Sequence, residues 1–305
     1  MIRIYTLLLF VMLLWGMNVS AIKVLVGAVD PLLLQGFRVM IAGIAVLLIC
    51  AGLGIFRLPK KHEWLTIAFI AIFNVILHHS FLAVGLERTS GINGSLILGM
   101  NPLITAMLAF LILHQRMSWL RVAGFILGFG GVVVTTLTGS GELTGLSLGD
   151  IFVFLGMFVQ GLSFILISKL KPTLDARLAT GYMLVFGAAV IFLTSQGFGS
   201  DIQDITRLFD WQLAGVFLFS AILATAFGHM TYNYAIKKVG PAESAIFLNL
   251  NTLFAVTAAA VFLNETITLY HTAGFILILT GVFLGTGALE HLIWKRKMRT
   301  ERKTW

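Results

Sequence analysis

The chain has 305 residues, of which 58% are hydrophobic and only 11% are charged. An ordinary soluble domain carries roughly a quarter charged residues, so this composition excludes a water-soluble fold. The single cysteine, Cys50, excludes an internal disulfide and a cysteine-based metal site.

Ten apolar runs follow one another along the chain, and each has the length of about 20 residues that a helix needs to cross a bilayer. We therefore predict an all-α membrane protein with ten transmembrane helices. The longest connection, around 199–210, has no room for a soluble domain. The predicted spans cover approximately residues 4–28, 31–56, 64–86, 91–114, 118–138, 148–168, 177–198, 211–236, 241–263 and 268–292.

The first run also resembles a secretory signal, because Arg3 precedes an apolar core and the small residues Ser20 and Ala21 follow it. Removing this run would leave nine spans and reverse the distribution of loop charges. We therefore expect it to be retained as the first span.

The lysines and arginines predict the orientation, because cytoplasmic loops keep the cations. With the N-terminus inside, 17 of the 21 cations fall at cytoplasmic ends, whereas only Arg88 and Arg207 fall in outer loops. This indicates a multi-pass protein of the plasma or inner membrane with both termini in the cytoplasm. The net charge of +8 then reflects topology, and a nucleic-acid partner is not expected. The basic tail at 293–305 is interpreted as a cytoplasmic anchor, with binding to anionic lipid as the alternative.

The chain also repeats itself. A shift of 150 residues aligns 79–134 with 229–284 without a gap, and 13 of the 56 aligned positions are identical. The identical pairs include His79 with His229 and Asn101 with Asn251. The predicted units are a first five-helix repeat at 1–140, a second five-helix repeat at 147–292 and the basic tail at 293–305.

Five spans is an odd number, so the second repeat must cross the bilayer in the opposite direction to the first. Inverted repeats around a site at the midplane are typical of secondary transporters, in which exchanging the conformations of the two halves opens the site to alternate sides. The repeat therefore predicts a transporter.

Several motifs resemble the EamA branch of the drug/metabolite transporter superfamily. They are Trp15-Gly16-x-Asn18-x-x-Ala21-Ile22-Lys23, Pro31, Phe37-Arg38, Asn101-Pro102 and Leu263-Asn264-Glu265-Thr266-x-Thr268. The resemblance covers essentially the whole chain and implies a ten-span inverted-repeat carrier of small metabolites, often amino acids, with a central cavity between the halves. One departure is Gln115, where family members often carry an acid, whereas Glu265 is kept. A mechanism that needs both carboxylates therefore does not transfer to this chain.

The expected function is secondary transport, in the export direction, of small metabolites such as amino acids by alternating access. The expected partners are the lipid bilayer, a small-molecule substrate and protons as a coupling ion, and no cofactor is expected. Two alternatives stay open. One is a membrane scaffold or lipid-handling protein that transports nothing, and the other is an intramembrane enzyme, for which the sequence offers no reactive group of residues.

Two cations lie inside predicted spans at similar depth. Lys23 lies near the outer end of the first span, and Arg38 lies about two turns, roughly 10 Å, inside the second. Either side chain can snorkel to the headgroups, but a charge held at the depth of Arg38 usually faces protein or water. We expect Arg38 to face the cavity, where it attracts a carboxylate or holds the helices together through a carbonyl.

His79 and His229 each lie eight residues before a pair of loop charges, which places both near the bilayer midplane on either side of one cavity. Because histidine changes charge near physiological pH, we expect one or both to bind substrate or carry a proton. Tyr232 and Asn233, on the next turn, are expected to shape specificity. The other expected substrate-binding residues are Asn18, Asn101 and Asn251. The alternative for all these groups is a structural hydrogen bond between helices.

Two further patterns are set aside. GLSLG at 145–149 matches a nucleophile elbow, but that chemistry needs a strand-turn-helix, and Ser147 falls in a predicted outer loop. His78 and His79 are adjacent, whereas metal ligands on one face of a helix need spacings of three or four residues. No metal site is therefore expected.

Overall fold

The computed structural model describes residues 2–113, 118–138, 147–287 and 289–290. Every regular element within these ranges is helical. Gln115 and the basic tail at 293–305 lie outside the described residues.

The helices follow the predicted runs closely. The first half contains α1 (Ile2–Val26), α2 (Pro31–Gly52), α3 (Lys61–Ala71), η1 (Ile72–Leu77), α4 (His78–Arg88), α5 (Gly91–Leu98), α6 (Asn101–Leu113) and α7 (Trp119–Thr138). The second half contains α8 (Leu148–Ser168), α9 (Ala176–Gly197), η2 (Ile202–Phe209), α10 (Trp211–Leu218), η3 (Phe219–Phe227), α11 (Gly228–Val239), α12 (Pro241–Phe262) and α13 (Leu269–Gly285).

Within the described residues, seven helical stretches are long and apolar enough to cross a membrane. Three shorter apolar helices, at Trp119–Thr135, Phe247–Phe262 and Leu269–Gly285, occupy the remaining predicted runs. Large apolar side chains such as Leu193 and Ile126 are exposed on the outside of the bundle, as expected of a surface that faces lipid. The fold is that of a multi-pass helical membrane protein.

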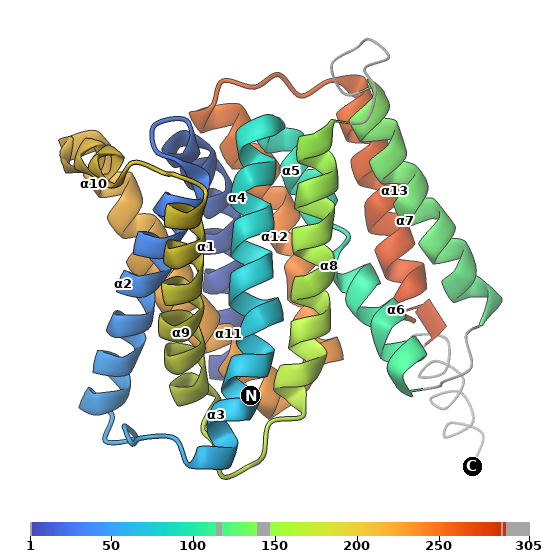
Figure 1. Ribbon diagram of the computed structural model, residues 1–305. Coiled ribbons are helices and arrows are strands. Elements are labelled where there is room, and N and C mark those ends of the chain that lie inside the picture. The colour runs from blue at the N-terminus through green and yellow to red at the C-terminus, as the bar shows by residue number, and fades with distance from the viewer. Residues whose placement is uncertain (1, 114–117, 139–146, 288, 291–305) are drawn as a thin grey trace, which may run out of the picture.

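The helices form one bundle with two ends (Figure 1). The upper end carries the connections α1–α2 and α12–α13, and the lower end carries the start of α1 and the connection α2–α3. Local residues explain where several helices begin. Asp30 accepts a hydrogen bond from the Leu33 amide and precedes Pro31 at the start of α2, while Asp175 accepts one from the Arg177 amide at the start of α9.

Two long stretches change their helical geometry in the middle. In both, a π-helical segment, η1 or η3, interrupts the α-helix. The first segment ends immediately before His78 and His79, and the second ends at Phe227, two residues before His229. Segments of this kind expose backbone carbonyls and are frequent at functional sites. They therefore mark the level of the bundle at which the histidines lie.

Helices α7 and α13 pack with their backbones in close contact through glycines on both helices. A Cβ atom on Gly281 would lie 2.6 Å from the carbonyl oxygen of Gly124, and one on Gly131 would lie 2.7 Å from that of Gly274. Small residues at such contacts let helix backbones approach closely, as is common between membrane-spanning helices.

Gly281→Ala is expected to destabilise the protein by about 1–3 kcal/mol, because the added methyl group forces α7 and α13 apart. The matched control is Gly130→Ala in α7, where nothing lies within 4 Å of the added atom and the higher helix propensity of alanine slightly stabilises the helix. Thermal unfolding in detergent measures both variants. Equal midpoints for the two would contradict the close packing.

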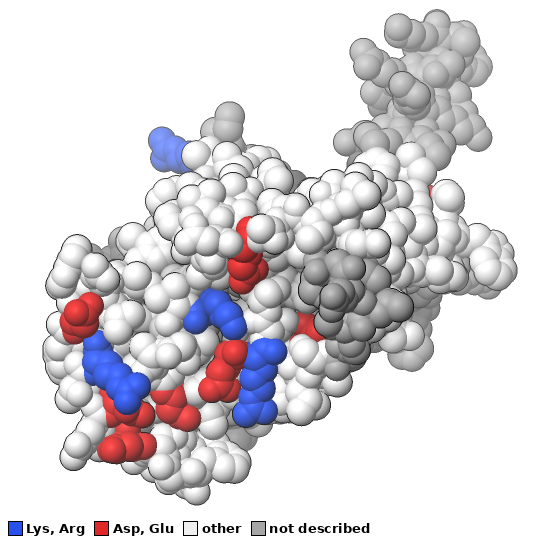
Figure 2. Space-filling view, turned by 90° about the horizontal axis from the view of Figure 1, so that it is seen from above, with Lys and Arg blue, Asp and Glu red and all other residues white. Residues whose placement is uncertain are grey.

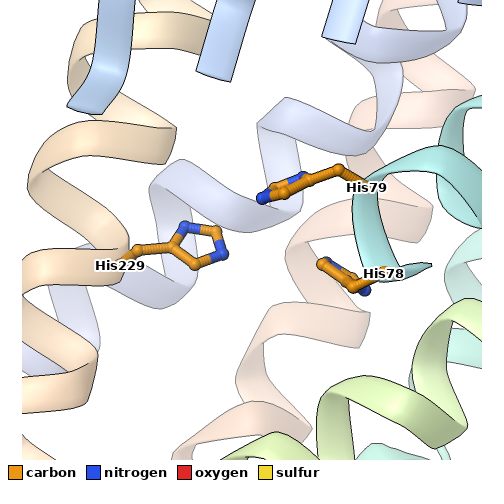
Figure 3. A group of neighbouring side chains, drawn as sticks. All are labelled: His78, His79 and His229. Atoms are coloured by element: carbon orange, nitrogen blue, oxygen red, sulfur yellow. The ribbon is translucent and has the colours of Figure 1, made fainter. Parts of the chain in front are cut away.

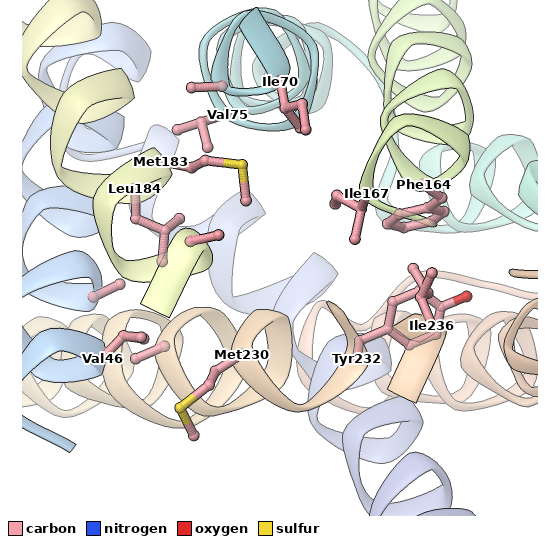
Figure 4. Packing of buried hydrophobic residues seen from close by; sticks show 14 of the residues in the cluster. Val46, Ile70, Val75, Phe164, Ile167, Met183, Leu184, Met230, Tyr232 and Ile236 are labelled. Atoms are coloured by element: carbon pink, nitrogen blue, oxygen red, sulfur yellow. The ribbon is translucent and has the colours of Figure 1, made fainter. Parts of the chain in front are cut away.

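The buried apolar side chains form two clusters. Figure 4 shows part of the first, in which Phe164, Met183 and Tyr232 pack between helices from both halves of the chain. Helix α1 joins the two clusters, since Trp15 belongs to the first and Val19 to the second. The junction between the clusters is where the polar residues of the interior gather.

Candidate functional site

A small cavity lies at this junction, with a volume of about 50 Å³. Its walls come from both halves of the chain. They are formed by Trp15, Asn18, Val19, Ile22, Arg38, His78, His79, Leu82, Leu98, Asn101, Gln160, His229, Leu248 and Asn251. This volume holds a few water molecules and is far below the roughly 300 Å³ at which pockets for small ligands begin. A metabolite therefore fits only after the helices around the cavity move apart.

Six of the eight residues expected to bind substrate line this cavity, namely Asn18, Arg38, His79, Asn101, His229 and Asn251. Three further polar or aromatic lining residues were not expected there, namely Trp15, His78 and Gln160. Trp15 is the first residue of the motif that carries the family resemblance, and its place in this motif could have indicated a role at the site. Nothing in the spacing of His78 or Gln160 distinguished them from other buried polar groups.

Arg38 is fully buried in α2, and all five of its N–H groups reach neutral acceptors. Nε and Nη2 donate to the Gln35 side-chain oxygen at 2.9 and 2.5 Å. Nη1 donates to the hydroxyls of Ser220 and Thr225, at 3.0 and 2.6 Å, in η3. The remaining Nη2 proton reaches Nδ1 of His79 at 3.1 Å. Arg38 is thus held by both halves of the chain and does not reach the membrane surface.

The contact with Arg38 defines the protonation of His79. A guanidinium can only donate hydrogen bonds, so Nδ1 of His79 is the acceptor, and the proton of the neutral ring is on Nε2. The Nε2 atom is buried and has no hydrogen-bond partner within the described part of the chain. His79 therefore presents an unused N–H donor.

A second chain of hydrogen bonds holds the opposite wall. Nδ1 of His78 donates to the Gly156 carbonyl at 3.0 Å, and Nε2 of His78 accepts from the Gln160 amide at 2.9 Å. The Gln160 oxygen accepts from Asn101 at 2.7 Å, and the Asn101 oxygen accepts from Thr105 at 3.0 Å. Because every member is satisfied, this wall is fixed and His78 is held neutral.

His229 is the least restrained of the three histidines. Neither ring nitrogen makes a hydrogen bond of normal geometry to a described group, and the ring has only a weaker contact with the backbone of Thr225. Its ring centroid lies 5.2 Å from that of His79 and 5.0 Å from the Trp15 indole. Figure 3 shows the His229 ring reaching from α11 toward the two histidines of α4.

Tyr232 and Asn233 lie outside the cavity lining. The Tyr232 ring packs 5.0 Å from Trp15 and 4.9 Å from Phe164, and Asn233 donates to the Thr180 hydroxyl at 3.0 Å. Both residues lie one helical turn after His229, as expected, but the Trp15 side chain lies between the cavity and this turn of α11. The Trp15 indole is itself held by a 2.8 Å hydrogen bond to the Ala224 carbonyl in η3.

The adjacent pair His78 and His79 does belong to a group of three histidines that could hold a metal ion, contrary to the expectation from their spacing. One ring nitrogen from each of His78, His79 and His229 lies within 4.8 Å of the others, because a histidine distant in sequence joins the adjacent pair. A metal ion is nevertheless disfavoured by the bonding. Both nitrogens of His78 are engaged, Nε2 of His79 carries a proton, and the cation of Arg38 lies against this cluster. Only His229 retains a free nitrogen lone pair.

Fold and site together define a helical membrane protein with a closed polar cavity at the centre of its bundle. The sequence matches the EamA-like transporter family over residues 2–137 and 147–286. The chain belongs to this family and is a membrane transporter, a membership that points away from an enzyme.

Two relatives illustrate the similarity. The uncharacterized transporter YyaM of Bacillus subtilis is 27% identical, over 95% of this chain and 95% of its own. A WAT1-related chloroplastic protein of Arabidopsis thaliana is 24% identical, over 92% of this chain and 68% of its own. A crystal structure that covers 94% of this chain and 98% of its own superposes with a TM-score of 0.66. Its sequence identity is 18%, so it supports the fold alone.

Proposed function

We propose that the protein is a secondary transporter of small metabolites such as amino acids, working by alternating access through the central cavity, and that it acts as an exporter. The observation that carries this proposal is the cavity itself, which is polar, buried and lined by both halves of the chain. The absence of a nucleotide-binding loop from the sequence favours an ion gradient or the gradient of the substrate as the driving force, with protons as the proposed coupling ion.

Polar contacts between the two halves at both ends of the bundle support alternating access. At the upper end, the Glu265 carboxylate accepts hydrogen bonds from the amides of Gly91 and Ile92 at 2.7 and 2.8 Å. At the lower end, Arg57 donates to the Thr173 carbonyl at 3.0 Å. Breaking one set while keeping the other would open the cavity to one side of the membrane at a time.

Ten crossings in two inverted repeats, at 1–140 and 147–292, are part of the proposal. Helix α1 begins and α13 ends at the lower end of the bundle (Figure 1), which supports an even number of crossings. The π segments η1 and η3 precede residues that the repeat pairs, His79 and His229. This common position supports two halves built on one plan.

The proposed orientation puts the upper end outside and both termini in the cytoplasm of the plasma or inner membrane. The upper end, seen in Figure 2, carries acidic and basic side chains intermixed on one part of its surface. Lys23 is held near this end, where its ammonium donates to the carbonyls of Leu86 and Glu87 at 2.7 and 3.3 Å.

An impermeant maleimide applied to intact cells tests the orientation. Cys50 is buried and is replaced by alanine in the background. The exposed residues Gln203, at the upper end, and His62, at the lower end, are then changed singly to cysteine. Gln203→Cys is expected to react and His62→Cys to react only after the cells are permeabilised. The reverse pattern would invert the proposed topology.

Purified protein in liposomes tests the transport function with a panel of labelled amino acids and related metabolites. We expect saturable uptake that unlabelled substrate on the opposite side accelerates, as a carrier with one alternating site requires. His79→Gln, His229→Gln and the double variant are expected to lose affinity or the dependence on pH between about 5.5 and 8, the range of histidine titration. A protein that moves no solute would favour the scaffold or lipid-handling alternative.

A further inference from the structure

The hydrogen-bonding capacity left free in the cavity is small and specific. Among the described lining residues, the buried polar atoms without a partner are Nε2 of His79, the two ring nitrogens of His229 and the side-chain oxygen of Asn251. The amides of Asn101 and Gln160 are engaged with each other. A ligand that displaces water from the cavity therefore meets the two histidine rings first.

These rings offer converging donors. His79 must present its Nε2–H, because Nδ1 accepts from Arg38. His229 makes only the weaker contact with the Thr225 backbone, so rotation of its ring can turn an N–H toward the same point. The ring centroids are 5.2 Å apart, a separation at which one carboxylate group can accept from both.

The charge of the site is positive, which suits a negatively charged ligand. Arg38 keeps its proton at physiological pH, and none of the ion pairs found in the described part of the chain involves it. A buried cation without a counter-charge is costly, and in a medium of low dielectric it attracts an anion and repels a second cation strongly. The missing counter-charge is one that a ligand can supply.

We propose, as a deepening of the transport function above and resting on it, that the substrate carries a carboxylate that binds between Nε2–H of His79 and the ring of His229. Arg38 is the positioning residue behind this contact, since it fixes the tautomer of His79 and supplies the compensating charge. The apolar part of the substrate lies against Trp15 and Leu248. The free oxygen of Asn251 accepts from a second polar group, such as the ammonium of an amino acid, whereas a substrate with net positive charge is rejected.

Histidine-detected NMR tests this site without relying on transport. The protein is labelled with ¹⁵N-histidine, purified in detergent and titrated with acetate and acetamide, two probes of nearly equal shape, and with methylammonium as a small cation. The free protein is expected to show the Nε2–H tautomer at His79. Acetate is expected to shift the His79 and His229 signals, acetamide to bind at least about tenfold more weakly, and methylammonium to leave both signals unchanged.

Variants assign the signals and test the role of Arg38. His79→Gln and His229→Gln each remove one signal, and the exposed His62 serves as an internal reference that no probe should move. Arg38→Lys keeps the charge but loses the guanidinium fork, so the His79 tautomer is expected to become mixed and acetate binding to weaken at least about tenfold.

The outcomes separate the two proposals. An Nδ1–H tautomer at His79, or equal binding of acetate and acetamide, overturns the carboxylate site whatever the liposomes show. Binding selective for acetate in a protein that moves no solute keeps the site and removes the transport function instead.

Discussion

Replacing Arg38 by glutamine is expected to lower the transport efficiency, kcat/KM, for a carboxylate substrate about 100-fold. Without Arg38 the bound carboxylate has no compensating charge and the tautomer of His79 is no longer fixed. A buried charge left without its counter-charge costs roughly 2–5 kcal/mol, and 1.4 kcal/mol corresponds to about tenfold. The same change removes an uncompensated buried cation, so the folded protein should not lose stability to a comparable extent. Transport activity is thus expected to fall while the stability of the fold is kept. This result distinguishes a charge that acts on the substrate from one that only holds the helices together.

Uptake into liposomes and thermal unfolding of the same preparations measure the two quantities. The matched control is Arg88→Gln, since Arg88 pairs with Glu87 at the surface and its side chain is 53% exposed. This control is expected to transport at the unaltered rate. Normal transport by Arg38→Gln at wild-type protein level would show that the charge has no part in transport.

The helices were predictable because their signals are local and strong. Each span is a long apolar run, and its ends carry residues whose chemistry ends or begins a helix, such as Asp30 before Pro31 and Asp175 before α9. The internal repeat added information about the interior, since His79 and His229, and likewise Asn101 and Asn251, all line the one cavity. Equivalent positions in two similar halves face the same centre.

Other features of the site depend on contacts between distant segments. His78 joins His229 because α4 and α11, far apart in sequence, meet at the level of the π segments, and an apolar run does not reveal where its helix changes to π geometry. Tyr232 is excluded from the cavity by Trp15, whose position is set by a hydrogen bond across 209 residues. Periodicity predicts the face that a residue occupies, but not how far along that face the cavity extends.

The contact of Glu265 with α5 bears on how the cavity opens. Its two carboxylate oxygens accept from the first two amides of α5, Gly91 and Ile92, where the helix dipole favours negative charge. Asn264 precedes it with a positive φ of 54°, a conformation that asparagine tolerates better than most residues. This arrangement joins the loop after α12 to the helix that carries Leu98 into the cavity wall.

The sequence repeat predicts no equivalent of this Glu265 contact at the other end of the molecule. The positions that match Glu265 and Gly91 under the shift of 150 residues are Gln115 and Pro241. Proline has no amide proton to donate, and glutamine carries no charge. The two hydrogen bonds of Glu265 therefore hold the upper end, whereas at the lower end the two halves are joined differently, by Arg57 to the Thr173 carbonyl and by the Arg121–Glu290 ion pair.

Glu265→Gln is accordingly expected to open the upper end more often. The glutamine oxygen can keep one of the two hydrogen bonds in a weaker neutral form, but its NH2 group cannot accept the other. This change removes roughly 1.5–3 kcal/mol, which corresponds to an increase of about 10- to 100-fold in the open population. The measurement is the rate at which an impermeant thiol reagent, added from the upper side, modifies Val19→Cys at the cavity wall in the Cys50→Ala background.

Gly91→Ala should act in the same direction, because its added methyl group lies 3.2 Å from the Glu265 carboxylate. Glu87→Gln, which removes an exposed carboxylate from the same end, is the matched control and should leave the rate unchanged. If Val19→Cys is modified at the same rate in the Glu265→Gln and Glu87→Gln variants, the contact of Glu265 with α5 does not hold the upper end closed.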